Sequence, residues 1–277
     1  MPELPEVETV RSGLHARFVG ASISKVEVYH PRSIRHHLAG AIDFAGRLAG
    51  RTFIDSGRRG KFMWLALDDD ALLLCHLGMS GQFLAQSDSE IDHKHLRTRF
   101  QFATVGPQLW FIDQRTFGHL QLCEPEGNIP AAIRHIAPDP FEEDFDLDQC
   151  ITRLQQRRTA IKSALLDQGL VSGVGNIYAD EALWRSGIHG KRRADRVSRS
   201  EAAQLLADCR DVMAEAIAEG GTSFDELYVD TNGESGYFER RLDAYGRAGQ
   251  PCRRCGIPMQ REVIGGRSSH SCPHCQK

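Results

Sequence analysis

The spacing of apolar residues predicts a helix at the start of the chain and strands after it. Residues 5–18 place Val7, Val10, Leu14 and Phe18 on one helical stripe behind Pro5, which suits the first helical position. From about Ser22 to Leu122 β-branched and aromatic residues dominate. Strands are predicted over Ile23–Val28, Arg51–Arg58, Lys61–Leu67, Ala71–Leu77, Arg97–Ala103 and Gln108–Asp113. Short strands joined by turns indicate an antiparallel sandwich or barrel.

The second half of the chain has a helical pattern. Helix-forming residues run over 147–167, a second helix is predicted from Asn176, and a third over about 200–219. Residues 128–148 are rich in proline and acids and form the predicted linker. Gly173-Val174-Gly175 precedes Asn176, and such a turn lets free backbone N–H groups approach an anion. Many ordinary interhelical turns also contain two glycines, so this motif alone fits both interpretations.

The composition indicates a chain with a sizeable core and no membrane span. Its 277 residues are 41% hydrophobic, with a mean hydropathy of -0.38. Every apolar run is shorter than the roughly 20 residues that a membrane helix needs. The N-terminus carries acids and prolines where a signal peptide has a basic end and an apolar stretch. We therefore expect a cytoplasmic protein.

Charge is unevenly distributed along the chain although the net charge is only -3. Residues 236–277 carry eight basic and three acidic side chains, whereas Glu201–Glu234 holds nine acids against Arg210 alone. Such segregation suits a face that binds a polyanion and an acidic back. Ordinary solvated faces would give a similar pattern, so charge leaves both interpretations open.

Four of the eight cysteines have the spacing of a metal site. They form two Cys-x2-Cys pairs separated by sixteen residues: Cys252, Cys255, Cys272 and Cys275. Each pair lets one turn point two sulfurs at a single ion, which predicts a structural zinc with all four positions filled. The alternative, two disulfides, is disfavoured in a cytoplasmic chain. Zinc ribbons bind DNA, RNA or protein, so the site does not itself name a function.

The N-terminus carries candidate chemistry. Proline after the initiator methionine normally leads to removal of Met1, so the mature chain is expected to begin at Pro2. Its secondary amine can attack an aldehyde-like sugar carbon and form an iminium, and Glu3 can act as general acid and base. Pro-Glu is common, and without further motifs an ordinary helix lead-in would be the better interpretation.

Several motifs together resemble the formamidopyrimidine-DNA glycosylase family. They run in order along the chain: Pro2–Val10, His76-Leu77-Gly78-Met79-Ser80-Gly81, Gly173–Ala179, Gly236-Tyr237-Phe238 and the cysteine pairs. The resemblance implies an α+β protein: an N-terminal antiparallel β-sandwich with a leading helix in 2–127 and a linker over 128–146. A helix–two-turn–helix domain follows in 147–235, and a zinc hairpin in 236–277. Duplex DNA would lie in the cleft between the two halves.

The resemblance also implies an activity and its residues. The enzyme would extrude an oxidised purine, such as 8-oxoguanine or a formamidopyrimidine, from duplex DNA. Pro2 would attack C1′ while Glu3 assists sugar ring opening, and β- and δ-elimination would then cut the strand. By similarity Lys61 supports β-elimination, Arg267 supports δ-elimination, and Glu6 lies in the lesion pocket. Asn176 and Lys162 match phosphate contacts beside the lesion. Arg158, which would also contact a phosphate, and one of His93 or His95 match further DNA-contact positions.

Three more residues match the family's group that fills the space left by the flipped base: Met79, Arg115 and Phe117. Methionine and phenylalanine can wedge between base pairs, and Arg115 can hydrogen-bond the orphaned base. The family often has Asp-Pro-Arg-Arg-Phe-Gly, whereas this chain has Gln114 and Thr116 around Arg115. This departure affects the stiffness of the loop and its preference for the opposite base. The mobile lesion-capping loop of the family corresponds to residues 223–236.

Three other functions compete with a purine-repair glycosylase. The endonuclease VIII group shares the Pro-Glu start and the zinc hairpin but prefers oxidised pyrimidines, and it tends to lack the Met-Arg-Phe group. A non-catalytic damage-binding protein would not need Pro2, Glu3, Lys61 and Arg267 together. An RNA-binding zinc-ribbon protein would show no preference for a lesion in duplex DNA. No pattern suggests an obligate oligomer, so we expect a monomer.

Overall fold

The computed structural model describes residues 2–87, 93–221 and 241–277. The chain divides into two compact units. One contains the chain up to Arg134, and the other contains His135–Glu219 and the C-terminal segment from Phe238. Within the described residues no helix has the length and apolar character needed to cross a membrane. The predicted lesion-capping loop, residues 223–236, lies outside the described residues.

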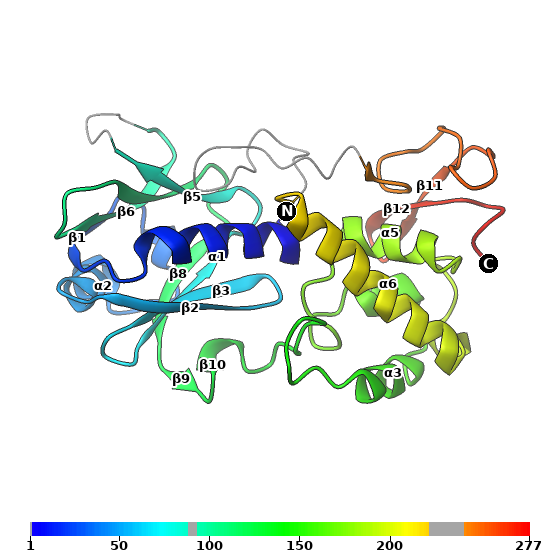
Figure 1. Cartoon of the computed structure of the whole chain (residues 1–277), viewed down its shortest axis with the longest axis horizontal. Helices are drawn as coiled ribbons and strands as arrows, with labels where there is room; N and C mark the ends of the chain where they lie inside the picture. Colours follow the sequence, from blue (N-terminus) through cyan, green and yellow to red (C-terminus); the bar gives the residue numbers. More distant parts are fainter. Residues whose placement is uncertain (1, 88–92, 222–240) are drawn as a thin grey trace. The chain divides into compact units, whose positions relative to one another are not determined.

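The first helix, α1 (Leu4–Phe18), forms as the apolar stripe predicts (Figure 1). Pro5 lies in its first turn, where a missing N–H costs nothing. All four residues of the stripe are buried in the core of the first unit, where α1 packs along strands β2 and β3.

The first unit is an antiparallel β-sandwich led by α1, as the sequence predicts. One sheet has the strand order β1-β6-β7-β5 and the other β2-β3-β4-β8, and every pairing within them is antiparallel. Both sheets contribute side chains to one buried cluster. The strands are β1 (Ile23–Val28), β2 (Phe53–Arg59), β3 (Phe62–Leu67), β4 (Leu72–His76), β5 (Gly81–Gln86), β6 (Leu96–Phe102), β7 (Gln108–Asp113) and β8 (His119–Cys123).

The sequence does not predict three elements of this unit: β5, β8 and the helix α2 (Gly40–Leu48). Strand β5 buries only Gly81 and Phe83 fully, so its alternation is weak. Helix α2 begins at a glycine and has no side-chain cap, so its start carries no local signal. Short elements complete the unit: η1 (Pro31–Ile34), β9 (Pro125–Glu126), β10 (Ile129–Pro130) and η2 (Ala131–Ile133).

The second unit is helical, with a break that corrects the predicted helix over 147–167. Two helices occupy that range, α3 (Leu147–Gln155) and α4 (Ile161–Leu165). The N–H groups of Ile161 and Lys162 bond the carbonyls of Arg192 and Gly190, at 2.7 and 3.2 Å, instead of continuing a helix. The remaining helices are α5 (Asn176–Arg185), η3 (Ala194–Arg196) and α6 (Arg199–Ala218).

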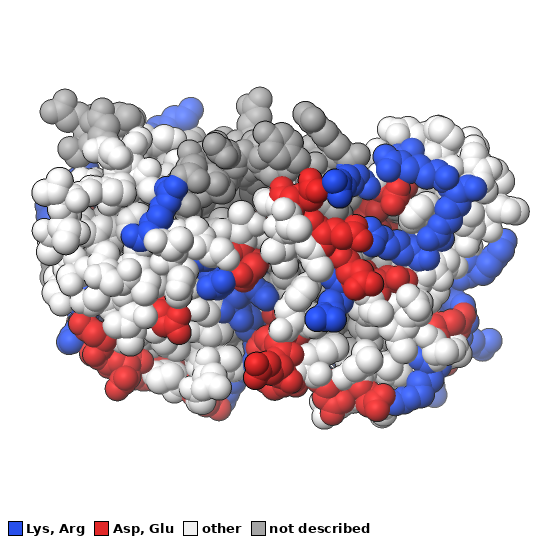
Figure 2. Space-filling view, viewed as in Figure 1, with Lys and Arg blue, Asp and Glu red and all other residues white. Residues whose placement is uncertain are grey.

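The C-terminal segment forms the expected hairpin from β11 (Gln260–Ile264) and β12 (Arg267–Ser271). Gly265 and Gly266 make its two-residue turn, with φ of 56° and 77°, and such a turn needs positive φ at both positions. Arg267 is therefore the first residue after the turn, and its side chain is exposed. Figure 2 shows lysine and arginine side chains gathered over this hairpin.

Candidate active site and metal centre

The N-terminus of α1 holds the two predicted catalytic residues in a sheltered position. Pro2 is buried, and Glu3 is only 3% exposed. The backbone N–H of Glu3 donates to the Glu6 carboxylate at 2.8 Å, which fixes the first turn. Glu6 is itself buried. This arrangement places Pro2 and two carboxyl groups together at the start of α1, in a buried position.

Lys61 lies in the two-residue turn of the β2–β3 hairpin. Gly60 precedes it with a φ of 54°, which suits glycine at the first turn position. Cationic side chains at a hairpin tip are usually solvated, but Arg59 and Lys61 are each only 8% exposed. The two cationic side chains therefore pack into the protein, where their positions are fixed.

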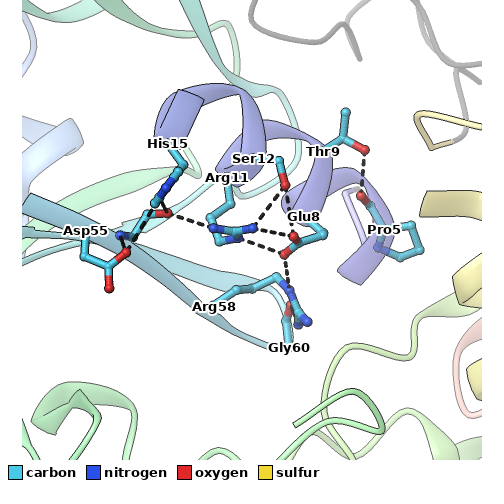
Figure 3. A network of polar contacts seen from close by, with 10 residues as sticks. Pro5, Glu8, Thr9, Arg11, Ser12, His15, Asp55, Arg58 and Gly60 are labelled. Atoms are coloured by element: carbon cyan, nitrogen blue, oxygen red, sulfur yellow. Dashed lines mark hydrogen bonds and ion pairs between the residues drawn. The ribbon is translucent and has the colours of Figure 1, made fainter. Parts of the chain in front are cut away.

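A polar network joins α1 to the strand that precedes Lys61 (Figure 3). Glu8 accepts hydrogen bonds from Arg58 and Arg11, at 3.0 and 2.6 Å. Arg58 also donates to the Gly60 carbonyl at 3.3 Å. Burial alone would raise the pKa of Glu8, but the two arginines outweigh it and lower that pKa. Glu8 is thus ionised at neutral pH and ties the helix that carries Glu3 to the turn that carries Lys61.

The three predicted void-filling residues come from two neighbouring turns. Met79 lies between β4 and β5, and Arg115 and Phe117 lie in the loop between β7 and β8. The turns touch closely, because a Cβ on Gly78 would lie 2.4 Å from the Phe117 carbonyl carbon. The Arg115 guanidinium stacks 5.2 Å from the centre of the Phe117 ring, and that ring is 45% exposed. A large exposed apolar ring beside an arginine suits insertion into a base stack.

His93 and His95 precede β6 and lie together, with ring centres 5.9 Å apart. His93 accepts the backbone N–H of His95, and His95 contacts Arg97 at 3.3 Å. Burial, together with the nearby Lys94 and Arg97 charges, lowers the pKa of His95. Both rings remain partly exposed, so their geometry does not choose between them as the DNA contact.

The glycine turn before α5 is held by a side chain that the sequence does not single out. The Gln168 amide accepts the Gly173 N–H at 3.0 Å and donates to the Val174 carbonyl at 3.0 Å. Asn176 begins α5, and its amide reaches Ser268 Oγ at 3.4 Å. Arg158, a predicted phosphate contact, is exposed. The turn is therefore rigid at the point where the helix N–H groups become available.

Lys162 differs from the other predicted phosphate contacts because it is fully buried. Its ammonium donates to Asp180 at 2.6 Å and to the Ser268 carbonyl at 2.7 Å. The Asp180 carboxylate also accepts from Ser269 and from the backbone of His270. Lys162 thus joins α4 and α5 to β12, the strand that starts at Arg267. Its predicted phosphate contact stays a prediction.

The four predicted zinc ligands converge. Their sulfurs lie within 4.8 Å of one another, with 4.0 Å between Cys252 and Cys275 and 3.5 Å between Cys255 and Cys272. A tetrahedral zinc with bonds of about 2.3 Å places its sulfurs about 3.8 Å apart. Trp184 of α5 donates to the Cys252 sulfur at 3.5 Å. The cluster therefore fits one structural zinc ion with no open position.

Removal of zinc with a chelator is expected to expose these four thiols and to unfold the hairpin. The other four cysteines should stay slow toward a thiol reagent, because burial raises the pKa of Cys75 and Cys209, and that of Cys123 and Cys150 to about 11. Thiol titration before and after chelation, alongside zinc analysis, measures both effects. Cys252→Ser is the matched variant. Retention of one zinc per chain by that variant would contradict the assignment.

A histidine cluster behind the β7–β8 loop predicts a loss of stability in mild acid. Burial and neighbouring charge lower the pKa of His76 to about 4 and of His119 to about 3. In the unfolded state both pKa values return to about 6.5. The unfolded state therefore binds more protons than the folded state as pH falls from 6.5 toward 4, and stability declines. His119→Gln should reduce the stability that is lost between pH 7.5 and 4.5 by an amount on the order of 3 kcal/mol. Urea unfolding at pH values from 7.5 to 4.5 measures the loss of stability in both proteins. An equal loss in the wild type and in His119→Gln would refute the prediction.

Known proteins resemble this chain over its whole length. The Formamidopyrimidine-DNA glycosylase N-terminal domain matches residues 1–120, its H2TH domain residues 136–226, and the zinc finger found in FPG and IleRS residues 249–277. Proteins named formamidopyrimidine-DNA glycosylase from Salinispora arenicola and Thermobifida fusca are 57% and 53% identical. Each alignment covers 100% of this chain, and 96% and 97% of those proteins respectively.

Solved structures of Lactococcus lactis Fpg have the same fold. A complex with DNA containing an abasic site has a TM-score of 0.87 at 34% identity, with 99% of each chain covered. A mutant in complex with DNA containing Fapy-dG has a TM-score of 0.89 at 35% identity, with 100% of each chain covered. The matched domains agree with the structure, which has a sandwich that begins with Pro2-Glu3 and a cluster of four cysteines near its end. The chain therefore belongs to the formamidopyrimidine-DNA glycosylase family.

Proposed function

We propose that this protein is a DNA glycosylase and abasic-site lyase that removes oxidised purines, including 8-oxoguanine and formamidopyrimidines, from double-stranded DNA. The observation that carries this function is the full-length similarity to proteins named formamidopyrimidine-DNA glycosylase, at 51–57% identity. The solved relatives bind DNA with an abasic site or with Fapy-dG, which supports the same substrates here. The protein acts as a monomer in the cytoplasm, and its domains follow the bounds predicted from the sequence.

In this proposal Pro2 is the nucleophile. Its nitrogen forms a bond to C1′, and the bond between C1′ and the damaged base breaks, with the electron pair leaving on the base, which takes up the proton that the Pro2 amine loses. Glu3 gives a proton to the ring oxygen as the sugar opens, which leaves an iminium between Pro2 and C1′. The burial of Glu3 supports this role, since a sheltered carboxyl exchanges protons with the substrate rather than with bulk water.

Strand cleavage follows from the acidity of the iminium. Loss of the C2′ proton breaks the bond from C3′ to its phosphate, and a second elimination breaks the bond at C5′. Lys61 assists the first elimination and Arg267 the second. The Glu8–Arg58 contact supports the role of Lys61, because it fixes the turn that carries this lysine relative to α1.

DNA binding uses the remaining predicted residues. Arg158 and the Asn176 helix start contact phosphates, and Glu6 lies in the lesion pocket. Lys162 is proposed as a further phosphate contact beside the lesion, and its ammonium also holds β12 through the Ser268 carbonyl. The group that fills the vacated space is Met79, Arg115 and Phe117, and one of His93 or His95 makes a further contact.

Borohydride trapping tests the proposal on three duplexes, which carry 8-oxoguanine opposite cytosine, thymine glycol opposite adenine, or no damage. We expect a covalent adduct on the 8-oxoguanine strand and none on undamaged DNA. A stronger adduct with thymine glycol would favour an endonuclease VIII-like enzyme. Lesion-specific binding without an adduct would favour a damage-binding protein, and no binding to any of the three would refute the proposal.

A further inference from the structure

The loop that carries Arg115 and Phe117 is organised by a buried residue to which the sequence assigns no role. Asp113 ends β7 and is only 1% exposed. One of its carboxylate oxygens accepts the Ser80 hydroxyl at 2.6 Å and the Arg115 N–H at 3.1 Å. The other accepts the Gly118 N–H at 2.7 Å. A single carboxylate therefore binds both ends of the loop.

The same carboxylate reaches the turn that carries Met79. Ser80 follows Met79 directly, and its hydroxyl donates to Asp113 while accepting the Arg115 N–H at 2.9 Å. The two turns are packed without space between them, because a Cβ on Gly78 would lie 2.4 Å from the Gly118 backbone nitrogen. Asp113 and Ser80 thus join the two turns into one unit.

Arg35 braces the outer side of this loop. It follows η1, and its guanidinium donates to the carbonyls of Phe117 and Gly118, at 2.8 and 2.7 Å. Asp113 thus accepts hydrogen bonds from N–H groups of the loop on its buried side, and Arg35 donates to carbonyls of the loop on its outer side. Meanwhile the side chains of Arg115 and Phe117 stay exposed. The backbone of the loop is therefore held in one conformation, while the two side chains that it carries are exposed.

The backbone at Thr116 shows that the surroundings impose the shape of this loop. Thr116 has a φ of 55°, in the left-handed region that a β-branched residue rarely adopts. Such strain persists only where neighbouring contacts over-determine the conformation. The family's usual proline and second arginine are replaced here by Gln114 and Thr116, so the rigidity of the loop comes from the contacts of Asp113 and Arg35.

We propose that Asp113 is a positioning residue that holds Met79, Arg115 and Phe117 as one preformed unit and thereby sets the discrimination of the base opposite the lesion. This inference rests on the proposed function. An arginine distinguishes bases only when its guanidinium is held in register with the acceptor atoms of the base edge. A loose loop would let Arg115 adjust to any opposite base, and binding would then cost more entropy for every partner.

The test compares single-turnover excision of 8-oxoguanine opposite each of the four bases by the wild type and by Asp113→Asn. The asparagine amide N–H group would face the Gly118 N–H, or the Arg115 N–H if it turned round, so one backbone donor loses its acceptor in either orientation. We expect the ratio between the best and the worst opposite base to fall about tenfold. Ser80→Ala, a milder change, should lower the same ratio less. Asp70→Asn, at an exposed turn of the same unit, is the charge-matched control and should leave the ratio unchanged.

Cleavage of a single-stranded abasic oligonucleotide separates positioning from misfolding. This substrate has no opposite base, so Asp113→Asn should cleave it within about threefold of the wild-type rate. An equal loss on single-stranded and duplex substrates would overturn the proposal, and so would an unchanged ratio in both Asp113→Asn and Ser80→Ala. A wild-type protein inactive on every duplex would instead refute the proposed function.

Discussion

The Pro2→Gly variant is expected to lose borohydride trapping on 8-oxoguanine duplexes by about a hundredfold or more. A secondary amine forms a charged iminium directly, whereas the primary amine of glycine forms an imine that must gain a proton before elimination. Glycine also frees the backbone ahead of Glu3, whose N–H is fixed on Glu6 at 2.8 Å. The effect should therefore fall on the covalent steps.

Binding to a duplex with a stable abasic analogue provides the control for this variant. Because Pro2 contributes chemistry and little contact area, Pro2→Gly should bind the analogue within a few-fold of the wild type. Loss of both trapping and binding would mean a misfolded N-terminus or a different role for Pro2. Unchanged trapping would identify another nucleophile, and Lys61 would be the first residue to replace.

Asp180→Asn is expected to destabilise the second unit by about 3–5 kcal/mol. Asp180 is 1% exposed, and its carboxylate binds the fully buried ammonium of Lys162 together with Ser269 and His270. Asparagine keeps the size of the side chain but removes the negative charge, so the buried ammonium loses its counter-charge. Removing one partner of a buried ion pair costs far more than the pair contributes on balance.

Hydrogen exchange measured unit by unit reports this loss without assuming that the whole chain unfolds at once. Asp148→Asn is the matched control, because Asp148 pairs with Arg199 at an exposed position, where such pairs contribute little. Adding Lys162→Met to Asp180→Asn should recover part of the stability by removing the uncompensated charge. If Asp180→Asn alone were as stable as the wild type, groups other than Asp180 would have to stabilise the Lys162 ammonium.

Local patterns in the sequence identify the parts of this protein that short-range physics controls. The stripe from Val7 to Phe18 predicts α1, and the strands β1 and β7 have the bounds that their residues indicate. The spacing of Cys252, Cys255, Cys272 and Cys275 predicts the zinc cluster, because two turns suffice to aim four sulfurs. Such features depend on neighbours within a few residues.

The positions of buried polar groups depend instead on contacts between distant parts of the chain. Ser80 meets Asp113 across 33 residues, and Lys162 meets the Ser268 carbonyl across 106. The residues near Lys162 in the sequence do not distinguish a buried lysine that joins two elements from an exposed lysine that contacts a phosphate. In the same way, the break between α3 and α4 depends on carbonyls at Gly190 and Arg192.

The sequence by itself determined the α1 stripe, the core strands and the metal ligands, and through its motifs it indicated the family. Only the tertiary structure decided that Lys61 and Lys162 are buried, that Glu8 joins α1 to the turn that carries Lys61, and that Asp113 organises the loop of Arg115 and Phe117. The physical reason is that periodicity and spacing are local properties, whereas a buried charge is stable only where the fold brings its partner to it.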